Sequence, residues 1–115
     1  MNSEQLKETL QYFIGTEYYH RLGLYKTLAT DGVFYFCETA EAFWLFDEIA
    51  NFVTYKTEEP FVTVIAESNG HKGRITFEDG NCNKIGCKEL DYTDLPEGTW
   101  KFFVVDNVVM LPSEY

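Results

Sequence analysis

The chain has 115 residues, of which 45% are hydrophobic and 17% aromatic, and its 19 acidic and 9 basic residues give a net charge of −10. This length predicts a single domain, 1–115, and the apolar content excludes a disordered chain. The charge argues against direct binding to nucleic-acid phosphates. No stretch approaches the ~20 apolar residues of a membrane span, and the polar start does not resemble a signal peptide. We therefore expect a cytoplasmic protein that binds no membrane.

The first predicted element is a helix over residues 3–14. Asn2 or Ser3 can cap its start, and Gly15 supplies the stop. Its apolar face consists of Leu6, Leu10, Phe13 and Ile14.

Residues 16–29 mix tyrosines, which favour strands, with a glycine. They predict one short strand over residues 17–21 and a second over residues 24–28.

Residues 30–53 are expected to be the element around which the fold is built. Asp31 is the expected N-cap. One apolar stripe at helical spacing contains Val33, Phe36, Cys37, Ala40 and Trp44. A second, almost opposite, contains Ala42, Leu45, Phe46, Ile49 and Val53. Either the helix breaks near Thr39, whose hydroxyl can cap a new turn, or one helix is buried on two sides. We favour the break, which leaves Glu38 and Glu41 exposed at the junction.

The pattern changes after a polar linker over residues 54–60. Five β-rich runs separated by turn signals cover residues 61–68, 74–79, 83–90, 99–105 and 108–111. In the fourth run Trp100, Phe102 and Val104 share one face. The predicted fold class is α+β, with two or three helices in the N-terminal half packed on one face of a four- to five-stranded antiparallel meander.

Four short segments resemble an uncharacterised family of small bacterial, cyanobacterial and phage proteins, a domain of unknown function. They are Thr30-Asp31-Gly32-Val33, Trp44-Leu45 leading into Asp47-Glu48-Ile49, Tyr92-Thr93-Asp94-Leu95-Pro96, and Leu111-Pro112-Ser113-Glu114-Tyr115. The resemblance implies no established activity or ligand. It does imply a cytoplasmic protein that often travels with mobile elements.

The three cysteines favour a reducing compartment over a disulfide framework. Cys37 is expected in the core, and the spacing of Cys82 and Cys87, with His71 upstream, is wider than in usual zinc sites. The chain has no Gly-rich phosphate loop, nucleophile elbow or zinc-protease motif. We expect no metal and no cofactor.

Acidic residues offer the remaining candidate chemistry. Asp31 and Asp94 each follow a threonine before a turn, and can form an acid–base pair, although capping and turn roles explain them more simply. Asp47 and Glu48 lie beside Trp44. Asp47 is buried if the central helix is continuous and exposed if it breaks.

Tyrosine excess beside many carboxylates favours a contact between proteins. The preferred reading is a non-enzymatic binding protein, an accessory or inhibitor protein associated with mobile elements, that meets a basic protein partner. The candidate contact residues are Tyr18, Tyr19, Tyr25, Asp31, Trp44, Asp47, Glu48 and Asp94.

Two alternatives stay open. One is a small hydrolase or ligand-binding domain with a pocket between the central helix and the sheet, in which two of Asp31, Asp47 and Asp94 converge. The other is a homodimer that pairs through an exposed strand edge or an aromatic face.

Overall fold

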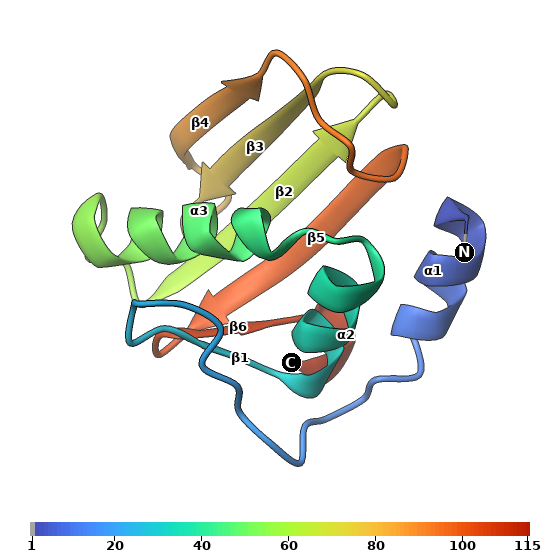
Figure 1. The fold of residues 1–115 in the computed structure, drawn as a ribbon. Helices are drawn as coiled ribbons and strands as arrows, with labels where there is room; N and C mark the ends of the chain where they lie inside the picture. Colours follow the sequence, from blue (N-terminus) through green and yellow to red (C-terminus); the bar gives the residue numbers. More distant parts are fainter. Residues whose placement is uncertain (1) are drawn as a thin grey trace.

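The centre of the molecule is a six-stranded mixed sheet with helices packed on one face (Figure 1), in a computed structural model that describes residues 2–115. In chain order the elements are α1 Ser3–Leu10, β1 Leu28–Ala29, α2 Asp31–Thr39, α3 Phe43–Tyr55, β2 Phe61–Ser68, β3 Gly73–Glu78, β4 Lys84–Leu90, β5 Gly98–Val105, β6 Val108–Met110 and a 3-10 turn, η1, Pro112–Glu114. The predicted α+β class is confirmed.

The predicted meander is only partly correct. The strand order is β1-β6-β5-β2-β3-β4, and β1 pairs with β6 in parallel. Strands β2, β3 and β4 form the expected antiparallel series, but β5 returns to pair with β2. The loop over residues 91–97 carries the chain back. Its Thr93 N–H donates to the carbonyl of His71 at 2.8 Å, and the Ser68 hydroxyl donates to the carbonyl of Leu95 at 3.1 Å.

Helix α1 ends four residues earlier than predicted. Its start is as expected, because the Asn2 side chain accepts from the Gln5 N–H at 2.8 Å. The helix ends earlier than expected because Tyr12, Phe13 and Ile14 are bulky aromatic or β-branched residues with weak helix propensity. Ile14, placed on the buried face by the sequence pattern, is 82% exposed.

The strands predicted over residues 17–21 and 24–28 are wrong. What forms is a single bridge between His20 and Ala29 and the two-residue strand β1. Residues 11–27 instead make an irregular segment, the strap, which runs along the lower rim of the molecule in Figure 1. The favourable β propensity of its tyrosines is overridden because most of the strap has no neighbouring strand with which to pair.

The break in the central stretch is confirmed. Thr39 ends α2, and Glu41 takes a left-handed conformation (φ 53°) that turns the chain before α3. Thr39 does not cap the new helix, because the N-cap is Ala42, which makes no side-chain capping bond. Glu38 and Glu41 are both exposed, as expected.

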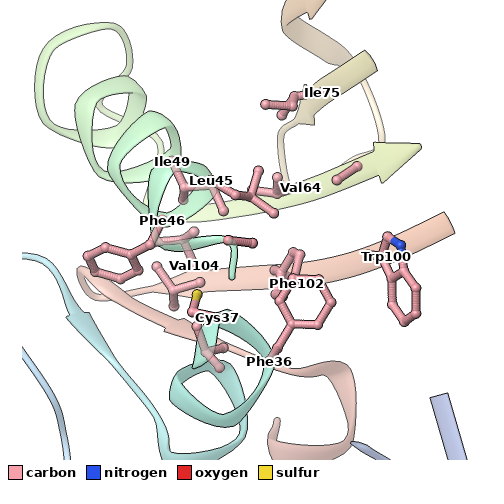
Figure 2. Packing of buried hydrophobic residues seen from close by; sticks show 14 of the residues in the cluster. Phe36, Cys37, Leu45, Phe46, Ile49, Val64, Ile75, Trp100, Phe102 and Val104 are labelled. Carbon is pink, nitrogen blue, oxygen red and sulfur yellow. The ribbon is translucent and has the colours of Figure 1, made fainter. Parts of the chain in front are cut away.

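The two apolar stripes meet over the sheet. Figure 2 shows Phe36 of α2 beside Phe102 of β5, with ring centroids 5.2 Å apart, while Leu45 and Ile49 of α3 point toward Val64 of β2. Trp100, Phe102 and Val104 share this face, as predicted, and all three are buried. Each large side chain buried here contributes about 1.5–3 kcal/mol, so this layer holds the helices in place.

Within residues 2–115, no α-helix lies on the other face of the sheet (Figure 1), and we call this the open face. The rings of Phe61, Phe103 and Tyr115 form a cluster on it, with centroids 5.1–5.4 Å apart. Phe61 and Phe103 are half-buried and Tyr115 is exposed.

Candidate functional site

The candidate contact residues do not form a single surface. Tyr18, Tyr19 and Asp31 lie where the strap meets α2, whereas Tyr25, Asp47 and Glu48 line a cavity between α3 and β4. Trp44 is half-buried against the core, and Asp94 is exposed in the loop between β4 and β5. The structure therefore offers two separate places to consider.

Asp31 is not the N-cap of α2 but its first residue. The N-cap is Thr30, whose hydroxyl oxygen accepts from the Val33 N–H at 3.4 Å. This leaves the Asp31 carboxylate free to bind the strap. Its Oδ1 hydrogen-bonds His20 Nε2 at 2.7 Å, and its Oδ2 accepts from the Glu17 N–H at 2.9 Å.

These hydrogen bonds keep Asp31 charged. The bond from His20 is the main cause that lowers the pKa of Asp31 below its ordinary value of 3.8, and the Glu17 N–H lowers the pKa further. The His20 ring stacks on Phe34, with centroids 4.6 Å apart. At neutral pH this position thus carries an oriented carboxylate.

A hollow of about 420 Å³ opens beside Asp31, and we call it the 12–17 hollow. It is lined by Tyr12, Phe13, Ile14, Gly15, Thr16, Glu17 and Asp31. Tyr12 is 84% exposed and Ile14 82%, and Tyr18 and Tyr19, just beyond, are also exposed. Tyr12 and Ile14 are not among the contact residues predicted from the sequence, because the helix predicted over residues 3–14 includes both. The signal for an earlier helix end is the run of three bulky residues directly before Gly15.

The Glu114 side chain accepts hydrogen bonds at the N-terminus of α2. Its Oε1 accepts from the Thr30 hydroxyl at 2.6 Å and from the Leu111 N–H at 3.0 Å, and its Oε2 accepts from the Gly32 N–H at 3.2 Å. A Cβ on Gly32 would lie 2.6 Å from Leu111 and 2.7 Å from Glu114, so only glycine allows this close approach. The donors of this helix end are thus engaged within the protein.

The second place is a cavity of about 300 Å³ between α3 and β4, the α3–β4 cavity. Its lining is Glu48, Asn51, Phe52, Lys56, Phe77, Ile85, Gly86, Cys87 and Lys88. An adjoining cavity of about 480 Å³ shares five of these residues and adds Tyr25 and Asp47. The alternative reading expected a pocket between the central helix and the sheet, and one is present there.

The predicted meeting of two carboxylates in that pocket is wrong. Of the three candidates only Asp47 comes near it: the break in the central helix leaves Asp47 exposed, and it lines the adjoining cavity. Asp31 lies at the 12–17 hollow and Asp94 lines neither cavity. No acid–base pair forms from these residues.

The buried Cys37 thiol is expected to be unreactive. Burial, helped by the negative charge of Asp47, raises the pKa of Cys37 to about 12, while Cys82 and Cys87 are exposed. Within residues 2–115 there is no group of three or more His, Cys, Asp or Glu side chains that could hold a metal ion. Over the same residues, no helix has the length and apolar character needed to cross a membrane.

Comparison with known proteins gives one match. A protein-family model covers residues 4–115, and its description is a family of unknown function, DUF6876. No curated protein and no solved structure matches the chain. The resemblance to a family without a known activity is thus confirmed over nearly the whole chain, while the bacterial, cyanobacterial and phage distribution stays a prediction.

Proposed function

Because the chain belongs to this family of unknown function, we propose its role from the geometry: it is a small acidic, non-enzymatic protein that binds a basic protein partner. The observation that carries the proposal is the 12–17 hollow, where the oriented Asp31 carboxylate lies beside exposed Tyr12 and Ile14. Tyr18 and Tyr19, which follow in the strap, are exposed as well.

The hollow suits a lysine or arginine side chain of the partner. The Asp31 carboxylate is held by His20 and by the Glu17 N–H, and its lowered pKa keeps it negatively charged, so it attracts a cationic side chain at the edge of the hollow. Glu17 adds a second carboxylate to the lining. Charge-assisted bonds to such groups are strong, and the net charge of −10 accelerates the approach of a basic protein.

The strap supports binding because it is ordered before any partner arrives. The Asp31 N–H donates to the Thr16 hydroxyl oxygen at 2.9 Å, and the Thr16 hydroxyl donates to the Tyr18 carbonyl at 2.6 Å. His20 and Ala29 exchange two backbone hydrogen bonds. A loop held in this way loses less conformational entropy on binding.

The surroundings of His20 support the absence of catalysis. A His–Asp pair acts in hydrolysis when it activates a nucleophile. Here, within residues 2–115, the His20 ring contacts Asp31 and Phe34, and Cys37 is buried with a raised pKa. We therefore propose a cytoplasmic accessory or inhibitor protein associated with mobile elements. We also propose that two copies of the chain associate through the open face.

The test is a pull-down from a lysate of the source cells with three baits. They are the natural chain, a surface variant (Tyr12→Ser, Ile14→Ser, Glu17→Gln) and a control variant (Leu24→Ser, Tyr92→Ser, Glu97→Gln). Both variants remove two exposed apolar residues and one negative charge. We expect a partner with a basic surface to be retained by the natural and control baits at about 50 mM salt, and released at about 500 mM salt, where charges are strongly screened.

The surface variant should retain none of that partner. The proposal fails if no protein is retained, if retention does not depend on salt, or if the surface variant retains the partner as well as the control does.

A further inference from the structure

The α3–β4 cavity has a composition unlike the rest of this acidic protein. We propose that it binds a small aromatic carboxylate, with the ring against its apolar floor and the carboxylate at Lys56 and Lys88. This site is separate from the 12–17 hollow and does not depend on the function proposed there.

The floor of the cavity is made of carbon. Phe52 of α3 stacks on Phe77 of β3, with ring centroids 3.9 Å apart and the planes 9° from parallel. Phe52 reaches this position because β4 carries glycine beneath it: a Cβ on Gly86 would lie 2.5 Å from the Phe52 ring. Ile85 completes the apolar lining. Phe52 is 8% exposed and Phe77 3%, so a flat apolar group makes dispersion contacts with the parts of these side chains and of Ile85 that line the cavity.

The rim of the cavity favours an anion. Its charged residues are Lys56, Lys88 and Glu48, which sum to +1 in a protein whose net charge is −10. Lys88 Nζ donates to Glu48 Oε1 at 2.6 Å and keeps two further N–H groups. The Lys56 ammonium has no hydrogen bond or ion pair with any side chain in the described part of the chain. One positive charge is therefore left for a ligand.

Uncharged groups nearby also offer donors. The Asn51 amide donates to the Tyr25 hydroxyl oxygen at 3.0 Å, which leaves the hydroxyl proton and the second amide proton available. The adjoining cavity adds the Asp47 carboxylate, so the sum of charges there returns to zero. The ligand's negative group accordingly belongs at Lys56 and Lys88, and a volume of about 300 Å³ admits a ligand with one ring.

The test is an NMR titration of the full chain labelled with ¹⁵N, using three probes. Benzoate carries the ring and the anion, benzylamine carries the same ring with a positive charge, and acetate carries the anion alone. We expect benzoate to shift the Gly86 N–H and the Asn51 side-chain amide signals in a saturable way, with the millimolar affinity typical of so small a ligand. Benzylamine and acetate should give no saturable shift.

Two variants that each remove one positive charge distinguish benzoate binding at this cavity from a nonspecific attraction of benzoate to positive charge. Lys56→Gln should weaken benzoate binding about tenfold or more, because it removes a charge-assisted hydrogen bond. Lys72 lies in the turn between β2 and β3, outside both cavities, so the Lys72→Gln variant should bind benzoate with the affinity of the natural chain. The proposal is overturned if benzoate gives no saturable shift up to about 20 mM, if benzylamine binds as well, or if both variants weaken binding equally.

Discussion

Burial divides the three cysteines into two chemical classes. Cys37 is 2% exposed and has a pKa of about 12, whereas Cys82 and Cys87 are exposed. Because the thiolate is the reactive form, only about one Cys37 thiol in ten thousand is deprotonated at pH 8. We expect iodoacetamide to alkylate two thiols of the native protein and the third only after denaturation, as read by mass spectrometry of the peptides. Labelling of Cys37 at the rate of the other two would contradict the buried position of α2.

Single residues show where sequence reasoning reaches its limit. It placed a carboxylate and a threonine at the start of α2, but chose Asp31 as the cap where Thr30 is used. Both side chains are good caps, so propensity alone could not separate them. It also could not find His20 as the partner of Asp31, because that contact depends on the path of the strap and not on local spacing. The candidate site was thus predicted in part.

At the scale of elements, the contact between Glu114 and α2 has a measurable effect on stability. Glu114→Ala removes an acceptor from Thr30, Gly32 and Leu111 at once. We expect it to lower the free energy of unfolding by about 1–3 kcal/mol, measured by urea denaturation. Glu114→Gln keeps one acceptor oxygen, so its free energy of unfolding should lie between those of the natural chain and Glu114→Ala. Glu58→Ala, at an exposed position, should leave the free energy of unfolding almost unchanged. Equal stability of all three variants would show that this helix end does not need Glu114.

The bounds of the individual strands were predicted well, whereas their order in the sheet was not. All five predicted runs in the C-terminal half form strands whose ends agree within one residue, because alternation and turn residues are local signals. The strand order could not be read in the same way. The loop over residues 91–97 looks like a polar connection, yet Thr93 and Leu95 are buried in it and carry the chain back to β2. Tertiary burial of a few side chains decided the topology.

For the molecule as a whole, the open face is where two copies can meet despite a charge of −10 on each. Its charged side chains on the strands are Glu67, Arg74, Glu78, Lys84, Glu89 and Lys101, which sum to zero. The cluster of Phe61, Phe103 and Tyr115 supplies apolar contact. Pairing through this face therefore meets less repulsion than elsewhere.

We expect sedimentation equilibrium to show a dimer whose fraction rises with concentration and with salt, since salt screens the repulsion between the copies. Phe103→Thr, which keeps strand propensity but removes the ring, should shift the protein toward monomer, whereas Tyr92→Ser should not. A natural chain that stays monomeric at every concentration would exclude this pairing.

The strap has a consequence for the two proposed sites. Near its start, Glu17 binds Asp31 at the hollow; farther along, Gly23 lies against Asp47 and Tyr25 binds Asn51 beside the second cavity. One continuous segment thus takes part in both. An occupant at either end that stiffens the segment would lower the entropic penalty of binding at the other, and thermodynamic reciprocity requires the two affinities to change by the same factor.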